Sequence, residues 1–366
     1  MATIRGDNTN NVLRGTKSID KLLGLGGHDR LYGLAAADLL LGGAGNDLLR
    51  GATGNDILKG GSGRDTLFGD GGNDRLYGGS GNDIAVGGAG RDLLSGDGGN
   101  DRLFGGGSTD RLFGGTGNDV LFGGTGNDIL NGQAGVDVLL GEQGDDLLLG
   151  SFGGDILDGG DNIDTASYSQ SFEAVVIALQ DDGADTLGVG GHAEGDTLRG
   201  IENLTGSAHD DELIGNNLAN RLSGLNGDDT LSGEEGGDTI SGGAGNDTLL
   251  GGDGDDHLLG DTGDDELTGG ANNDFFYFGP GFGNDIITDF TIGGVNDTLV
   301  IDPDLAQEAG IDVNNPDWLG FVTANVSQTA GGVLVTVGSN SLLLEGKILL
   351  DLVGLTAADF LLFDFA

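Results

Sequence analysis

The chain has 366 residues, among them 79 Gly, 3 Pro and no Cys. Sixty acidic against 15 basic residues give a net charge of −45, which disfavours nucleic acid and anionic membranes as partners. Without Cys, disulfides and thiolate metal sites are excluded. No apolar run is long enough for a membrane span, and residues 1–7 lack the apolar core of a secretory signal peptide.

A nine-residue repeat, called a nonad here and numbered from its first glycine, begins at Gly6. Every ninth residue from Gly6 to Gly159 is Gly, which defines 18 nonads, and residues 206–277 hold eight more. Position 6 is Asp without a gap from Asp20 to Asp164, and again from 211 to 274 with Asn220 as the one exception. Position 8 of the first array is Leu at 16 sites.

The repeat predicts a parallel β-solenoid. Its Gly content forbids a helix, whereas three residues around each Leu suit a very short strand with the Leu facing inward and the other six forming a turn. Two such units complete one coil, so residues 18 apart should stack and build sheets on two faces. We therefore expect an all-β fold: a right-handed parallel β-roll (β-solenoid) of nonapeptide repeats in two arrays, with a β-rich C-terminal cap.

Composition divides the chain into four expected parts. These are a first roll at 1–167, an inter-array β segment at 168–205, a second roll at 206–274, and a C-terminal cap and secretion signal region at 275–366. The inter-array part contains a strand-like run at 172–179 and an acidic, Gly-rich loop at 181–191. In the cap, strand-like runs follow at 297–301, 333–337 and 341–344, and Trp318 is expected in its core.

The spacing of Gly and Asp predicts calcium sites. Calcium prefers six to eight hard oxygens, and a turn with Gly at positions 1, 2 and 4 can aim carbonyls at one point beside the Asp carboxylate. Stacked turns would enclose the ions, roughly one per well-formed nonad; Mg²⁺ fits poorly because it demands a tight octahedron. The candidate ligands are Asp29, Asp47, Asp56, Asp65, Asp74, Asp83, Asp92, Asp101, Asp119, Asp128, Asp137, Asp146, Asp155, Asp229, Asp238, Asp247, Asp256, Asp265 and Asp274.

Some nonads depart from the pattern, and we expect weak or empty sites there. They are 15–23, 33–41, 105–113 and 159–167. Three acids of the cap, Asp285, Asp289 and Asp297, could form a further calcium site, or could equally be simple turn or surface acids. His28, His192, His209 and His257 show no ligand spacing and are expected on the surface.

The nonads strongly resemble the RTX (repeats-in-toxin) family. Further similar segments are Asp164–Ser169, Gly200–Ser207 and Gly283–Phe290, while Leu355–Leu362 resembles the uncleaved signal read by type I ABC-transporter secretion machinery. The resemblance implies an extracellular bacterial protein, exported unfolded where calcium is scarce and folded where calcium is plentiful.

An apolar stripe is expected on the outside of one sheet. Position 9 in alternate nonads is apolar, interrupted by Arg50, at Tyr32, Phe68, Val86, Phe104, Phe122 and Leu140. Such a stripe can dock the second array or another copy of the chain. Apart from calcium and the secretion machinery, the candidate partners of the protein are a second copy or a cell-surface partner. Alternatively, its aromatic rings merely shield short strands.

The motifs of catalysis are missing, so we expect no enzyme and no catalytic residues. The sequence contains neither His-Glu-x-x-His nor Gly-x-Ser-x-Gly, and Gly6 already belongs to the first nonad, which leaves no room for a preceding enzyme domain. The leading interpretation is a secreted, calcium-binding structural, surface or adhesion protein. The alternatives are a carbohydrate- or ice-binding module, or an accessory subunit of a separately encoded toxin or enzyme.

Overall fold

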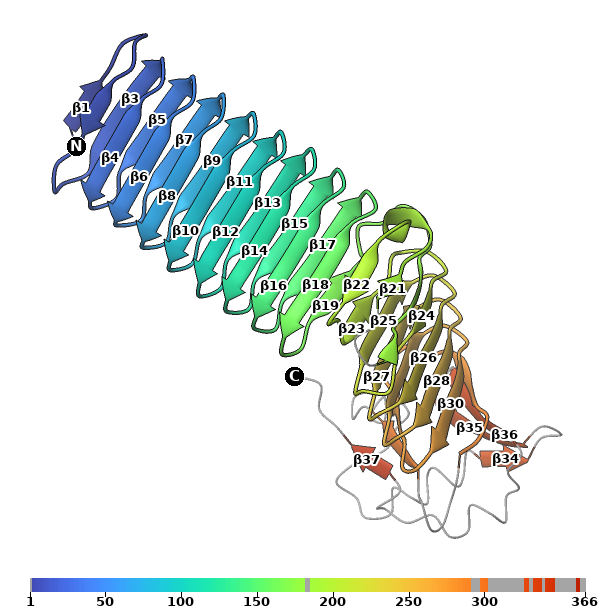
Figure 1. Ribbon diagram of the computed structural model, residues 1–366. Coiled ribbons are helices and arrows are strands. Elements are labelled where there is room, and N and C mark those ends of the chain that lie inside the picture. Colours follow the sequence, from blue (N-terminus) through green and yellow to red (C-terminus); the bar gives the residue numbers. More distant parts are fainter. Residues whose placement is uncertain are drawn as a thin grey trace. The chain divides into compact units, whose positions relative to one another are not determined.

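The chain folds into two compact units. A computed structural model describes residues 2–181, 185–290, 297–301, 326–328, 332–337, 340–345 and 360–362 (Figure 1). Unit 1 comprises residues 1–168 and 183–201, and unit 2 comprises 169–182 and 202–366. Trp318 and most of the 355–362 segment lie outside the described residues, and the four-part division made from sequence stays a prediction.

Unit 1 is built from short strands that alternate between two sheets. One sheet pairs, in parallel, β1 (Ala2–Arg5), β3 (Asp20–Gly26), β5 (Leu39–Ala44), β7 (Ile57–Ser62), β9 (Arg75–Ser80), β11 (Leu93–Gly98), β13 (Arg111–Thr116), β15 (Ile129–Ala134), β17 (Leu147–Phe152) and β19 (Thr165–Ser167). The other pairs β2 (Val12–Arg14), β4 (Arg30–Ala35), β6 (Leu48–Thr53), β8 (Thr66–Gly71), β10 (Ile84–Ala89), β12 (Arg102–Gly107), β14 (Val120–Thr125), β16 (Val138–Gln143), β18 (Ile156–Asp161) and β22 (Thr197–Arg199). β21 (Thr186–Leu187) pairs antiparallel with β22, and η2 (Gly191–Ala193) is a single 3₁₀ turn.

Unit 2 repeats this architecture. Its first sheet pairs β23 (Asn203–Thr205), β25 (Arg221–Asn226), β27 (Thr239–Ala244), β29 (His257–Thr262), β31 (Phe275–Phe278), β33 (Thr298–Ile301) and β37 (Phe360–Leu362) in parallel. Its second pairs β20 (Val176–Ala178), β24 (Glu212–Ile214), β26 (Thr230–Glu235), β28 (Thr248–Asp253), β30 (Glu266–Ala271), β32 (Asn284–Ile287) and β36 (Asn340–Glu345) in parallel, and β35 (Gly332–Val337) and β34 (Val326–Gln328) extend it antiparallel. The all-β parallel solenoid expected from the nonad is confirmed.

The register is 18 residues per coil throughout the regular repeats. Leu40 pairs with Leu58, and Leu121 pairs with Leu139. Each position-8 Leu from Leu22 to Leu157 is fully buried, so the leucines form two inner columns that pack against each other between the sheets. Each buried Leu contributes about 1.5–3 kcal/mol by removing apolar surface from water.

The strands are longer than the sequence predicted. Most span six residues, positions 7–9 of one nonad and 1–3 of the next, and not the three around each Leu. The additional pairing is possible because position 2 adopts positive φ, for example 112° at Gly43. With Gly at position 2, the main chain can adopt this conformation and approach the next coil without a clash from a Cβ atom. Position 2 keeps the same conformation where it is not Gly, as at Leu25 with a φ of 83°.

Between the arrays the chain contributes to both units. The expected strand at 172–179 shortens to β20, which pairs with β24 of unit 2 across 36 residues. Residues 183–201 belong to unit 1, where β22 pairs with β18 across 41 residues. The segment expected to be an acidic loop contains β21 and the start of η2.

Candidate metal sites

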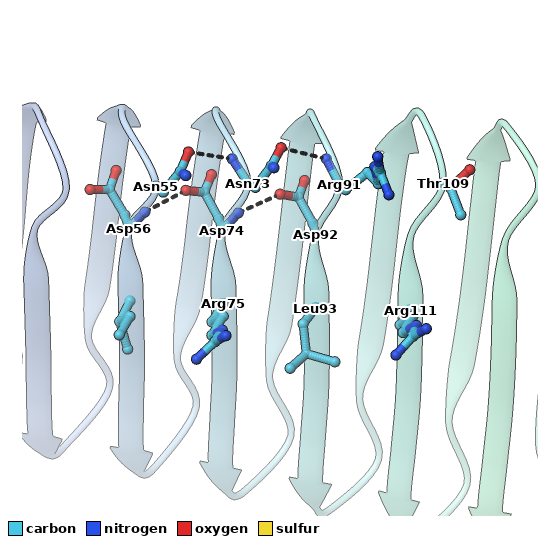
Figure 2. A pocket seen from close by; sticks show the side chains of 11 residues that line it. Asn55, Asp56, Asn73, Asp74, Arg75, Arg91, Asp92, Leu93, Thr109 and Arg111 are labelled. Atoms are coloured by element: carbon cyan, nitrogen blue, oxygen red, sulfur yellow. Dashed lines mark hydrogen bonds between the residues drawn. The ribbon is translucent and has the colours of Figure 1, made fainter.

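Each turn directs its position-6 side chain inward, because the Asp precedes a strand whose next inward residue is the buried Leu. The position-6 Asp residues are at most 4 % exposed. In the figure Asp56, Asp74 and Asp92 follow one another along successive coils (Figure 2). Their stacking repeats the 18-residue register of the strands.

A hydrogen bond joins each Asp to the next one in its column. The main-chain N–H of Asp56 donates to Oδ1 of Asp74, and the N–H of Asp74 donates to Oδ1 of Asp92, both at 2.7 Å (Figure 2). The same bond runs through four columns, which we number I to IV. Column I runs by eighteens from Asp20 to Asp164; column II from Asn11 through Asp29 to Asp155 and then Asp196; column III from Asp211 to Asp265 and then Asp285; column IV from Asn220 to Asp274 and then Asp297.

The second carboxylate oxygen has no such bond. Oδ2 is buried and without a hydrogen-bond partner at every ninth residue from Asp29 to Asp155, from Asp229 to Asp274, and at Asp285. A buried carboxylate oxygen left unpaired carries a large desolvation penalty, so a native structure must supply a counter-charge. All 19 Asp residues predicted as ligands from the sequence have this arrangement, and so do Asp38 and Asp110, whose nonads are irregular.

A carbonyl oxygen from the next coil lies beside most of these carboxylates. A Cβ on Gly123 would lie 2.6 Å from Oδ2 of Asp128 and 2.7 Å from the carbonyl oxygen of Gly141. The two oxygens therefore converge beside the Gly123 α-carbon from successive coils. Only Gly leaves this space to a small cation, and the same arrangement recurs at position 1 along the arrays.

Side chains alone do not complete a metal site. Within the described part of the chain, no three His, Asp or Glu side chains lie close enough together to hold a metal ion. A cation at these positions would therefore need main-chain carbonyls as well as Asp carboxylates. Hard oxygens of both kinds are the ligands that calcium uses, and the donors present therefore fit this ion.

Burial raises the pKa of the column carboxylates. The pKa of Asp92 is raised to about 6 and that of Asp101 to about 7, chiefly because burial disfavours the charged form. Neighbouring Asp carboxylates raise the pKa of Asp101 further, while the N–H of Asp83 opposes the shift. A bound divalent cation reverses this preference by favouring the ionised form.

Three column members lie outside the regular 18-residue spacing of the nonads. Asp196 enters column II across 41 residues, and its segment Asp196-Thr197-Leu198-Arg199-Gly200 has the spacing of nonad positions 6 to 9 and 1. Asp285 and Asp297 enter columns III and IV at spacings of 20 and 23 residues. Asp289 instead accepts the N–H groups of Gly269 and Gly270, so the three cap acids do not gather into one separate site.

Histidine provides one correction. His192 is 6 % exposed, and its ring centroid lies 4.3 Å from that of Phe152. The sequence-based expectation of a surface residue was wrong here, because η2 folds His192 inward, and burial lowers its pKa. His28 and His209 are exposed, as expected.

Comparison with family models decides what kind of repeat this is. The model of the RTX calcium-binding nonapeptide repeat matches residues 5–40, 41–76, 50–85, 77–112, 104–139, 132–166, 214–249 and 250–287. The chain belongs to the RTX calcium-binding repeat family. Its two rolls are calcium-binding RTX β-rolls, as their sequence resemblance implied.

Likenesses of this RTX chain to solved structures are weak. It is 21 % identical to the extracellular lipase LipA from Serratia marcescens, with a TM-score of 0.20, over 70 % of this chain and 40 % of the lipase. It is 17 % identical to a hyperactive, Ca²⁺-dependent, β-helical antifreeze protein from an Antarctic bacterium, with a TM-score of 0.18, over 91 % and 96 % of the two chains. The chain thus spans two fifths of the lipase, and neither TM-score supports an argument about function. The search of curated proteins found no match.

Among the described residues, no helix has the length and apolar character needed to cross a bilayer.

Proposed function

We propose that this RTX chain is a secreted bacterial protein that folds on binding calcium outside the cell and serves a structural, surface or adhesion role. The observation that supports it is the set of buried, unpaired Oδ2 atoms in the four columns. Without a cation these carboxylates repel one another in a thin core. With calcium, the same groups tie successive coils together.

The predicted Asp ligands would hold the ions together with the position-1 carbonyls. Asp128 and the carbonyl of Gly141 represent the arrangement: one carboxylate from a turn and one carbonyl from the turn stacked on it. Calcium supplies the positive charge between them. Because such a site exists only after the coils stack, the free energy of binding is also free energy of folding.

Circular dichroism and light scattering test the folding half of the proposal. In EDTA we expect a largely unfolded chain, and in millimolar Ca²⁺ a β spectrum with a smaller hydrodynamic radius. Mg²⁺ at the same concentration serves as the control and should restore little β structure, since Mg²⁺ retains its bound water and requires octahedral coordination. A β spectrum that persists unchanged in EDTA would refute calcium-dependent folding.

Export needs a separate test. The C-terminal residues 275–366 are fused behind a reporter and expressed with a type I ABC transporter, and residues 206–274 are fused as the control. Only the first fusion should accumulate in the medium. If the reporter stays inside the cell with both fusions, secretion by this route is contradicted. The proposal of calcium-dependent folding is not affected by that result.

A further inference from the structure

The first turn of each column is built differently from the turns that follow. These opening turns are 6–11, 15–20, 206–211 and 215–220, with Asp7, Thr16, Ser207 and Asn216 at position 2. In later turns position 2 is left-handed even where it is not Gly, as at Ala52 with a φ of 79°. None of the four opening residues, all of which the structure describes, is left-handed.

Because position 2 is not left-handed, each opening turn forms hydrogen bonds within itself; we call it a closed turn. The position-2 N–H donates to the position-6 side chain in all four: Asp7 to Asn11 at 2.7 Å, Thr16 to Asp20 at 2.6 Å, Ser207 to Asp211, and Asn216 to Asn220 at 2.8 Å. The position-4 N–H, in turn, donates to the position-2 side-chain oxygen, at 2.9 to 3.1 Å. In regular turns the position-4 N–H instead donates to the next coil, as from Gly45 to Ser62.

Hydroxyl and amide groups complete the closure. Thr16 Oγ1 donates to Oδ2 of Asp20 at 2.8 Å, and Ser207 Oγ donates to Oδ1 of Asp211 at 2.9 Å. The two remaining turns carry Asn at position 6, and its amide nitrogen donates to the position-2 side chain, from Asn220 to Asn216 at 3.3 Å. The protein therefore supplies here the donors that Oδ2 lacks in later turns.

We propose that these four closed turns are calcium-free caps, one at the start of each column, and that each templates the first calcium-binding turn of its column. This inference rests on the proposed calcium columns. Within the two arrays, Asn takes position 6 only in such caps, at Asn11 and Asn220, where a neutral side chain suffices. Column II also ends on a protein donor, since Tyr168 Oη donates to Oδ2 of Asp196 at 3.0 Å.

Native mass spectrometry in calcium tests the caps. Asp20→Asn and Asp211→Asn should bind as many ions as the wild type, because Asn occupies the same position in the other two caps. The matched controls Asp56→Asn and Asp229→Asn, in the same columns, should each bind at least one ion fewer. Their calcium midpoint for folding, followed by circular dichroism, should rise.

Two outcomes overturn the cap proposal: loss of an ion from Asp20→Asn or Asp211→Asn, or failure of either variant to fold in calcium. A wild type that binds no calcium would instead refute the proposed function. A third variant, Thr16→Val, keeps the ligands intact but removes the Oγ1 donor. It should keep the ion count and raise the calcium midpoint severalfold, and an unchanged midpoint counts against the templating role.

A different observation concerns the distribution of charge. Residues 1–111 contain 12 of the 15 basic residues, and 11 of their 14 acidic residues are buried column carboxylates. Outside the columns this segment therefore presents 12 basic residues against Asp7, Asp70 and Asp97. Once cations neutralise the columns, its surface is basic although the whole chain is acidic.

The basic side chains line two grooves beside the columns. One, of about 530 Å³, lies between the position-5 and position-7 side chains, with Arg75, Arg91 and Arg111 beside Asn55, Asn73 and Thr109 (Figure 2). The column residues Asp56, Asp74 and Asp92 also line it. The other, of about 550 Å³, includes Arg30, Arg64, His28 and Asn46. Elsewhere in this segment the guanidinium group of Arg102 lies 5.5 Å from the ring centroid of Phe104.

We infer that this surface binds an extended acidic polysaccharide. Arg75 and Arg111 stand two coils apart, which is about 9.6 Å at roughly 4.8 Å per strand. That spacing matches a glycan charged at alternate sugars, whereas duplex DNA carries one charge per about 1.7 Å. Guanidinium groups pair with carboxylates, and the Asn and Thr side chains offer hydrogen bonds to hydroxyl groups.

Binding of hyaluronan, in which charged and neutral sugars alternate, tests this surface on the full chain. In calcium we expect binding that weakens with salt, and none to neutral dextran. Arg75→Ser with Arg111→Ser should weaken it about tenfold. Arg50→Ser is the matched control, because Arg50 pairs with Asp70 at 3.0 Å, and should bind as the wild type does. The proposal fails if hyaluronan does not bind, if the double variant binds equally, or if duplex DNA binds more tightly.

Discussion

Tyr168 donates its hydroxyl hydrogen to Oδ2 of Asp196 over 3.0 Å, and both side chains are buried. The Oδ1 of the same carboxylate accepts the N–H of Asp155, the last regular member of column II. The column thus ends on a residue that lies 41 positions along the chain, with both of its oxygens satisfied by protein.

Replacing this phenol should destabilise unit 1. Tyr168→Phe leaves Oδ2 of Asp196 buried without its donor, at a cost of about 1–3 kcal/mol in the free energy of unfolding. Urea unfolding in saturating calcium measures the loss. The control is Tyr32→Phe, on the half-buried outer face, which should change stability little; equal effects of the two variants would contradict the role given to Tyr168.

Removing one column carboxylate should weaken calcium-dependent folding. Asp119→Asn replaces a charged, buried ligand candidate, so we expect a higher calcium midpoint and fewer bound ions. Asp97→Asn is the matched control, because Asp97 is exposed on a neighbouring coil and outside the columns. If both variants shift the calcium midpoint for folding equally, then net charge controls folding and the occupancy of the sites does not.

A methyl group beside the column should act like the loss of a ligand. In Gly123→Ala the new Cβ would lie 2.6 Å from Asp128 Oδ2 and 2.7 Å from the Gly141 carbonyl oxygen. Overpacking of this kind costs about 1–3 kcal/mol or more. Gly107→Ala, whose Cβ meets only Thr125 Oγ1 at 3.4 Å, should be nearly neutral. Calcium titrations followed by circular dichroism compare the two variants.

Acid should partly replace calcium. The pKa of Asp65 is raised to about 7 in the folded state, chiefly by burial, from an ordinary value of 3.8. The metal-free folded chain therefore binds more protons than the unfolded chain, and its stability falls as the pH rises through about 4 to 7. In EDTA we expect more β signal at pH 5 than at pH 8. A β signal that does not change between these pH values would contradict this.

The outer stripe can be tested as a contact surface. The rings of Phe104 and Phe122 stack at 4.6 Å on the outside of their sheet and remain partly exposed. If the stripe joins copies of the chain, Phe104→Ser with Phe122→Ser should reduce the oligomer size in calcium. If light scattering shows the same mass for the wild type and the double variant, the contact surface is contradicted and the rings only shield the short strands.

The sequence by itself determined the coil, the two inner Leu columns and the stacking of Asp residues 18 positions apart. These follow from residues nine positions apart, whose spacing alone decides which side chains stack. Only the tertiary structure shows how the first turns of the columns fold and which residues outside the regular repeat join the columns. Thr16 and Ser207 look like ordinary departures from Gly, yet their backbone turns them onto Asp20 and Asp211. Asp196, Asp285 and Asp297 join columns at spacings of 41, 20 and 23 residues, because the stacking of strands, and not distance along the chain, selects the partner of each carboxylate.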